Sequence, residues 1–202
     1  MRKNAVLTIG MVLMAAGIAT GASDSRPVFV PWKVLAPGVE PEGTALLTLY
    51  WVPASADQMR RSSLIMSSTL AEYAGRCVAM HVIRADDAER LARLGPDVDL
   101  PVAMLAEGTK EIARVHHHKG ALPSEAVEKM LREEIARRHE EAQRRLDAAR
   151  KHAASGDRRA AAAAYGDVVR LKCAFPRLAR SAQRAIDRIE RSGRVGNASQ
   201  HP

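Results

Sequence analysis

The sequence has few of the residues that several common kinds of functional site require. Its 202 residues include two cysteines, which excludes a disulfide-dense scaffold and a zinc site with four cysteine ligands. Two tryptophans, three tyrosines and two phenylalanines are too few for a platform on which nucleic-acid bases stack. Hydrophobic residues make up 47% of the chain, which is enough for a folded core. The length suits one domain of ordinary size, or a small domain with an appendage.

The formal net charge of +8 is unevenly distributed along the chain. Residues 1–22 contribute two basic side chains, and residues 23–130 hold 12 basic and 14 acidic ones. Residues 131–202 hold 17 basic and 9 acidic side chains, so the basic character belongs to the last third. The simplest interpretation of that third is an arginine-rich helical surface exposed to water. Attachment to a membrane or wall surface through basic helices is the alternative.

Residues 1–22 have the pattern of a secretory signal peptide. Arg2 and Lys3 precede an apolar run at 5–19 that is short for a membrane span, and small residues precede a cleavage point after Ala22. We therefore expect export to the bacterial periplasm or secretion, with an uncleaved N-terminal anchor as the alternative. Export makes nucleic acid an unexpected partner, and no integral membrane span is expected after cleavage.

Apolar runs and helical periodicities alternate in the next part of the chain. The four prolines within residues 23–43 predict an extended lead-in. After it, short apolar runs predict strands buried on both faces, and apolar residues three or four apart predict amphipathic helices. The order β-α-β-α-β-β-α predicts an α/β fold with helices on both faces of a mixed sheet. The expected elements are strands at 44–51, 77–83, 100–105 and 111–118 and helices at 58–75, 86–94 and from 123 onward.

Residues 44–136 resemble the thioredoxin family. The stretches LLTLYW, STLAEYAGR and VAMHVIRAD are similar to the strand before the family's active-site loop, the end of its first long helix and its next strand. The most specific stretch, LPVAMLAEGTKEIARVHHHKGALPSEAVEKML, resembles the family's closing pattern of strand, glycine turn, strand and last helix. The resemblance implies a thioredoxin-like mixed sheet flanked by helices. It also implies that Pro101 follows a cis peptide bond and faces the active site.

The position of the family's Cys-x-x-Cys motif holds no cysteine in this chain. It falls at 55–58 or 56–59, within the stretch VPASADQM. Because a serine hydroxyl neither ionises easily nor forms a disulfide, this loop cannot perform dithiol exchange. Ser55 or Asp57 could instead cap the helix. The resemblance then implies a redox-inactive module, chaperone-like or protein-binding, whose groove takes an extended segment of a cell-envelope protein. The candidate groove residues are Pro53, Ser55, Ala56, Asp57, Gln58, Leu100 and Pro101.

No residue pattern identifies a catalytic, metal or cofactor site. His116, His117 and His118 alternate across the predicted strand, so the first and third share a face, and no third metal ligand is identifiable. The G-x-S-x-G pattern of hydrolases is missing. We therefore expect no cofactor and no small-molecule substrate. The alternative function is an enzyme of the thioredoxin superfamily with non-dithiol chemistry, or single-thiol exchange through Cys77.

The two cysteines are far apart in the sequence. Cys77 begins the second predicted strand, and Cys173 lies in the last third of the chain. Oxidising conditions would allow a disulfide between them, provided that their Cα atoms come within about 7 Å. We expect two independent buried thiols, with the Cys77–Cys173 disulfide as the less favoured alternative.

The last third of the chain is predicted to be a helical extension, at 137–191. One apolar stripe continues to about Ala154 and predicts a single long helix or two helices joined at a kink. Two further helices are expected at 158–173 and 177–191, followed by a disordered tail at 192–202.

Part of this extension resembles a degenerate tetratricopeptide-type hairpin. Ala149, Gly156, Ala161 and Tyr165 stand at its small, turn, small and aromatic positions, although Cys173 stands where the repeat often has proline. Because one repeat cannot bury its own faces, the extension should pack on the sheet domain or on a partner.

Overall fold

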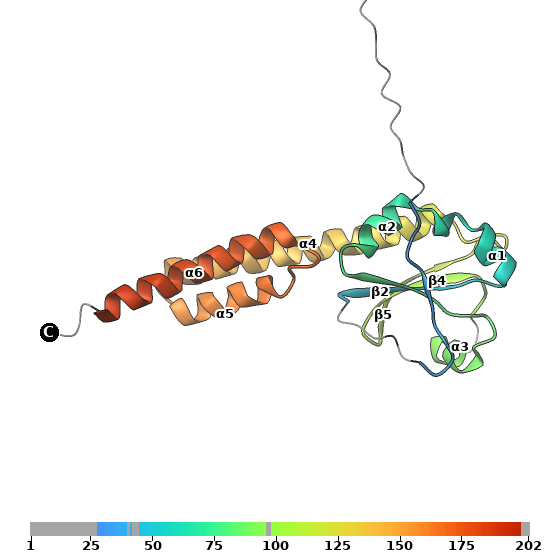
Figure 1. The fold of residues 1–202 in the computed structure, drawn as a ribbon, viewed down its shortest axis with the longest axis horizontal. Helices are drawn as coiled ribbons and strands as arrows, with labels where there is room; N and C mark the ends of the chain where they lie inside the picture. Colours follow the sequence, from blue (N-terminus) through green and yellow to red (C-terminus); the bar gives the residue numbers. More distant parts are fainter. Residues whose placement is uncertain (1–27, 40, 42–44, 96–97, 199–202) are drawn as a thin grey trace, which may run out of the picture.

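The computed structural model describes residues 28–39, 41, 45–95 and 98–198. Within these ranges the chain forms a five-stranded mixed sheet, with helices around it and a long helical extension at the C-terminal side (Figure 1). The predicted α/β fold with a C-terminal helical extension is thus confirmed at this level. The predicted signal peptide and most of the lead-in lie outside the described residues.

The sheet has the strand order β1-β3-β2-β4-β5. β2 is parallel to β3 and antiparallel to β4, while β1 runs parallel to β3 at one edge and β5 antiparallel to β4 at the other. Four of the strands lie within two or three residues of the predicted ranges. β1, a two-residue strand of the lead-in, carries no alternating pattern and was not predicted. The bounds are β1 Lys33–Val34, β2 Leu47–Val52, β3 Val78–Val82, β4 Val102–Glu107 and β5 Lys110–His116.

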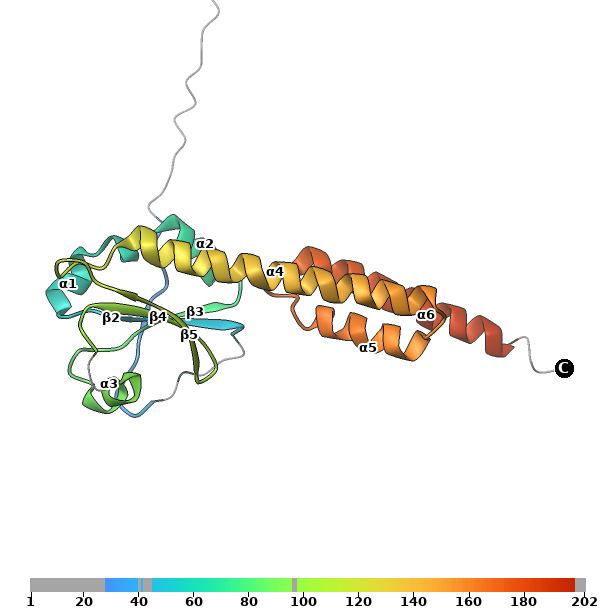
Figure 2. The ribbon, with the colours of Figure 1, turned by 180° about the vertical axis from the view of Figure 1, so that it is seen from behind.

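Both faces of the sheet are covered, as the apolar runs predict. Leu47, Leu49 and Trp51 of β2 alternate with Tyr50 and Val52, and the two sets join separate apolar clusters on opposite faces. Helices α1, α2 and the first half of α4 lie over the first face, and α3 lies over the second (Figures 1 and 2). The bounds are α1 Ala56–Arg61, α2 Ser68–Ala74, α3 Ala88–Leu94 and α4 Ser124–Ala154.

The prediction of a single helix at 58–75 is wrong, because the segment forms three short helical elements. α1 ends at Arg61, a 3-10 turn covers Ser63–Ile65, and α2 follows. The Ser62 hydroxyl accepts the Leu64 N–H, and the Ser67 hydroxyl accepts the Leu70 N–H. Serine side chains compete in this way for backbone groups, so they start new helices instead of continuing an old one.

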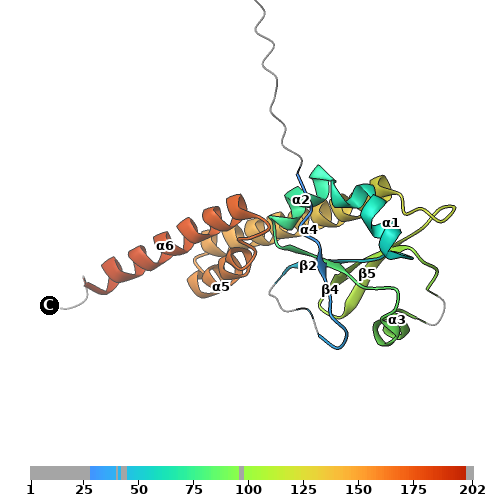
Figure 3. The ribbon, with the colours of Figure 1, turned by 45° about the vertical axis from the view of Figure 1, so that its right-hand side comes forward.

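The extension consists of the second half of α4 with α5 (Arg158–Val169) and α6 (Pro176–Ala198) (Figure 3). α4 is one continuous helix of 31 residues, which makes it about 46 Å long. α5 ends before Cys173, and α6 continues past the predicted end at 191, although its two glycines each cost about 1 kcal/mol. Among the helices that the structure describes, none is long and apolar enough to cross a membrane.

The extension has its own apolar core. α4, α5 and α6 pack against one another through small side chains, including three fully buried alanines, around Leu146 and Tyr165. Two of the four positions that resemble the tetratricopeptide pattern, Ala149 and Ala161, are completely buried, and Tyr165 is nearly so. The helical extension therefore buries these small side chains among its own three helices.

Candidate functional site

The candidate groove residues lie together at one end of the sheet. Val52, the last residue of β2, pairs with Val102, the first residue of β4. This pairing places Pro53 and Pro101 at the same end, and both side chains are buried. The Leu100–Pro101 peptide bond is cis, which confirms the prediction for Pro101.

The loop before α1 is fixed by its own polar side chains. The Ser55 hydroxyl caps the helix by accepting the Gln58 N–H at 3.1 Å. The Gln58 side chain accepts the Ala54 N–H at 2.6 Å and donates to the Gly120 carbonyl at 2.8 Å. Gln58 thus ties the loop to the turn that follows β5. Ser55, Ala56 and Asp57 remain exposed on the surface of this loop.

A surface cavity of about 320 Å³ adjoins this loop. The indole Nε1 of Trp51, which lines the cavity, is buried and has no hydrogen-bond partner among the described residues. Gln58 is among the candidate groove residues, but the sequence pattern did not single out the other lining residues, because they come from separate segments of the chain. The turn Lys119–Gly120, which has positive φ at both residues, precedes two of them. The cavity is lined by Trp51, Gln58, Arg61, Ser62, Ser63, Ala121 and Leu122.

The three consecutive histidines point to different surroundings. His117 Nε2 lies 2.9 Å from a carboxylate oxygen of Asp99, and its Nδ1 accepts the Gly120 N–H at 3.1 Å. His116 and His118 are exposed. No group of three potential ligands close enough to hold a metal ion occurs in the part of the chain that the structure describes. His117 therefore helps to fix the turn beside the groove.

The expectation of two independent thiols is wrong, because Cys77 and Cys173 form a disulfide. Their Cα atoms are 5.7 Å apart, within the range that a disulfide requires. Sequence alone could not show this proximity, because it depends on how the helical extension folds back on the sheet. Cys77 precedes β3 at the end where Leu47 pairs with Val78, which is the sheet end opposite the groove. The disulfide is therefore far from the Pro53–Gln58 loop.

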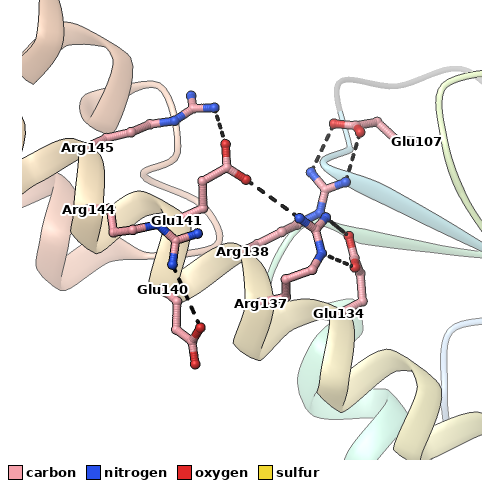
Figure 4. Close-up of polar contacts among 8 residues, drawn as sticks. All are labelled: Glu107, Glu134, Arg137, Arg138, Glu140, Glu141, Arg144 and Arg145. Atoms are coloured by element: carbon pink, nitrogen blue, oxygen red, sulfur yellow. Dashed lines mark hydrogen bonds and ion pairs between the residues drawn. The ribbon is translucent and has the colours of Figure 1, made fainter.

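An ion-pair network joins the extension to the sheet at this opposite end (Figure 4). Arg138 donates two hydrogen bonds of 2.9 Å to Glu107, which ends β4, and one of 2.7 Å to Glu134. Arg137 donates to both oxygens of Glu134, whose side chain is 7% exposed. Hydrogen bonds from Arg137, with a further one from Arg138, hold the pKa of Glu134 below its ordinary value. The hydrogen bonds from Arg138 lower the pKa of Glu107 in the same way.

Apolar contacts beside the ion-pair network complete the connection between the extension and the sheet, which we call the joint. Ala142 and Phe175 are buried there against Leu46, which precedes β2. The rings of His139 and Phe175 pack edge to face, with 5.4 Å between their centroids. The joint thus combines a disulfide, charged hydrogen bonds and a small apolar cluster. The helical extension is fixed to one end of the sheet, and the candidate groove residues lie at the other end.

Comparison of the chain with protein-family models finds no matching family, and comparison with curated proteins finds no match either. The functional interpretation therefore depends on the geometry of the groove. That end of the sheet offers exposed loop residues, a cavity and buried prolines, and the described residues contain no free cysteine. Such a surface can bind, but it has no nucleophilic thiol.

Proposed function

We propose that this chain is an exported, redox-inactive thioredoxin-like module that binds an extended segment of another protein. The single observation that carries the proposal is the position of Pro101 beside the Pro53–Gln58 loop, at a sheet end without cysteine among the described residues. The mixed sheet with helices on both faces also supports the thioredoxin-like assignment. Fold alone does not determine function, so the binding role depends on the groove.

The groove suits an extended peptide better than a reacting substrate. Gln58 and Ser55 hold the loop in place before any partner arrives, which reduces the ordering cost of binding. The cavity of about 320 Å³ beside it, which Trp51 and Gln58 line in part, can take one side chain of such a peptide. An anchoring side chain in a pocket is the usual source of peptide affinity.

Export is supported by two independent features. Residues 1–22 have the pattern of a signal peptide, and the Cys77–Cys173 disulfide suits an oxidising compartment. The alternative of single-thiol exchange through Cys77 would need that disulfide to be reduced first, because neither cysteine is free.

The proposal is tested by peptide binding at the groove. Peptides are selected against the full chain from a random displayed library, and the amide signals that they shift are mapped by NMR. We expect the shifts to gather at residues 54–58, at 100 and 102 beside Pro101, and at 118–122. Ala56→Arg, at an exposed groove position, should weaken binding about tenfold or more, which is about 1.4 kcal/mol.

The matched control is Ala148→Arg, at an exposed position of α4 in the extension. It adds the same side chain away from the groove and should leave peptide affinity unchanged. Shifts that gather on the extension, or equal effects of the two variants, would contradict the proposal.

A further inference from the structure

Five arginines of α6 form a single stripe along the helix, which we call the arginine stripe. They recur every three or four residues, so at 3.6 residues per turn their side chains project from the helix within an arc of about 80° around its axis. The arginine stripe is about 21 Å long, since each residue adds about 1.5 Å. Ala182 and Ala185 face the other way, into the core of the extension. The members are Arg177, Arg180, Arg184, Arg188 and Arg191, and all are exposed.

Protein groups do not neutralise the arginine stripe. Its first four members form no hydrogen bond or ion pair with other residues that the structure describes. Arg191 donates to the backbone carbonyl of Asp187 at 3.2 Å, while the Asp187 carboxylate accepts a hydrogen bond of 2.9 Å from Gln183. The guanidinium groups are therefore available to an external anion.

The arginines of α4 show the contrasting arrangement. Arg144 and Arg150 lie within ion-pair distance of Glu140 and Asp147, which are four and three residues earlier in the helix. This spacing is what an ordinary water-exposed helix uses to balance its charges. The same pairing extends to Arg137, Arg138 and Arg145. Five arginines of α4 are thus paired with acidic side chains, whereas the arginine stripe of α6 is not.

The arginine stripe offers charge without an apolar anchor. The hollow along it is lined by serine, aspartate and arginine side chains alone, namely Ser181, Arg184, Asp187, Arg188 and Arg191. Specific protein interfaces depend on buried aromatic or aliphatic anchors, which this surface lacks. A layer of phosphate groups needs only positive charge and planar donors, and arginine supplies both.

We propose that the arginine stripe attaches the extension to the surface of a membrane that contains anionic phospholipids. α6 lies along the surface with its guanidinium groups on lipid phosphates, and it does not insert because its apolar face is packed against α4 and α5. The choice of a membrane over nucleic acid rests on the proposed export. Since the groove is at the sheet end away from the extension, it stays open to a protein partner.

The test is co-sedimentation of the full chain with vesicles of phosphatidylglycerol and phosphatidylcholine, compared with vesicles of phosphatidylcholine alone. We expect binding to the anionic vesicles that is released by salt. The triple variant R180Q/R184Q/R188Q should lower the partition coefficient about a hundredfold, because each basic side chain near an anionic surface contributes about a factor of five. The control R144Q/R145Q/R150Q removes the same charge from paired positions on α4 and should bind within about threefold of the wild type.

Three results would overturn the proposal. Binding that does not depend on anionic lipid would show that residues other than the arginine stripe attach the chain to vesicles. Because all variants share the N-terminal apolar run, any contribution of that run to binding is the same in each. An equal fall in the partition coefficient of both triple variants would show that binding depends on the net charge of the chain and not on the arginine stripe. Tighter binding to duplex DNA than to vesicles of equal phosphate concentration would assign the arginine stripe to nucleic acid. The vesicle assay does not depend on export, which is tested separately by the N-terminal mass of the secreted chain.

Discussion

Cys77 and Cys173 are 96 residues apart in the sequence and joined by a disulfide, so the start of β3 is bonded to the loop between α5 and α6. This bond connects the sheet to the helical extension at the end opposite the groove. It also uses both cysteines of the chain, which leaves the groove without thiol chemistry.

Removal of the disulfide should destabilise the protein. The double variant Cys77→Ser/Cys173→Ser should lose about 2 to 4 kcal/mol of unfolding free energy, because a loop of 96 residues is no longer closed in the unfolded chain. Urea unfolding measures this loss. Wild-type protein in reducing agent should match the variant, whereas a wild-type midpoint that is insensitive to reductant would contradict the disulfide.

Arg138 should contribute more to stability than an arginine on the open surface. Arg138→Met removes the hydrogen bonds to Glu107 and leaves the buried Glu134 with one fewer partner, so we expect a loss of about 2 kcal/mol. Arg144→Met is the control, since that side chain is 69% exposed and 3.9 Å from its acidic partner. The control should change stability by less than about 0.5 kcal/mol. Equal effects in urea unfolding would show that the joint is not held by Arg138.

The joint should also make stability depend on acid pH. The arginines lower the pKa of Glu134 and Glu107 in the folded state, so these carboxylates stabilise the fold above the ordinary glutamate value of 4.5. Their contribution is lost as pH falls through the lowered pKa values. Glu134 should dominate, because Glu107 is 54% exposed and water screens its ion pair.

The measurement is the urea midpoint at about pH 6 and at about pH 3. Glu134→Gln should show a smaller drop than wild type between these conditions. Glu140→Gln, at an exposed position, serves as the control and should keep the wild-type drop. The idea fails if both variants behave alike.

His81 should produce a second pH dependence nearer neutrality. It lies on β3, is 4% exposed and stacks on Tyr50 at 6.0 Å. Burial lowers the pKa of His81 from its ordinary value of 6.5, so the unfolded chain takes up a proton first as pH falls. Stability from the neutral ring is therefore present above pH 6.5 and declines below it. His81→Phe should remove part of the loss between about pH 7 and pH 5, and His152→Gln should not. Thermal unfolding across this range that is identical in all three proteins would refute the assignment.

The sequence patterns predicted the features that depend on local order. The apolar runs predicted β2, β3 and β4, and the glycine turn after β4 predicted the return of the chain as β5. The resemblance implied the cis bond at Pro101 and its place beside the Pro53 loop. The helix predicted at 58–75 failed because Ser62 and Ser67 interrupt it with side-chain hydrogen bonds, which a periodicity of apolar residues does not detect.

Contacts between segments far apart in the chain could not be predicted from the sequence patterns. The disulfide and the Arg138–Glu107 pair both depend on α4 carrying the extension past the end of β4. The Gln58–Gly120 hydrogen bond likewise joins residues 62 positions apart. Pairwise contacts of this kind are set by tertiary packing and leave no periodic signal.

The most direct test of a binding module without thiol chemistry is a disulfide-reduction assay with the full chain, an insulin substrate and dithiothreitol. The account predicts a reduction rate equal to that of dithiothreitol alone, because the groove loop has no cysteine and because Cys77 and Cys173 lie at the opposite end of the sheet, even when dithiothreitol reduces the bond between them. Catalytic turnover above that rate, abolished by Cys77→Ser, would contradict the account and favour single-thiol exchange.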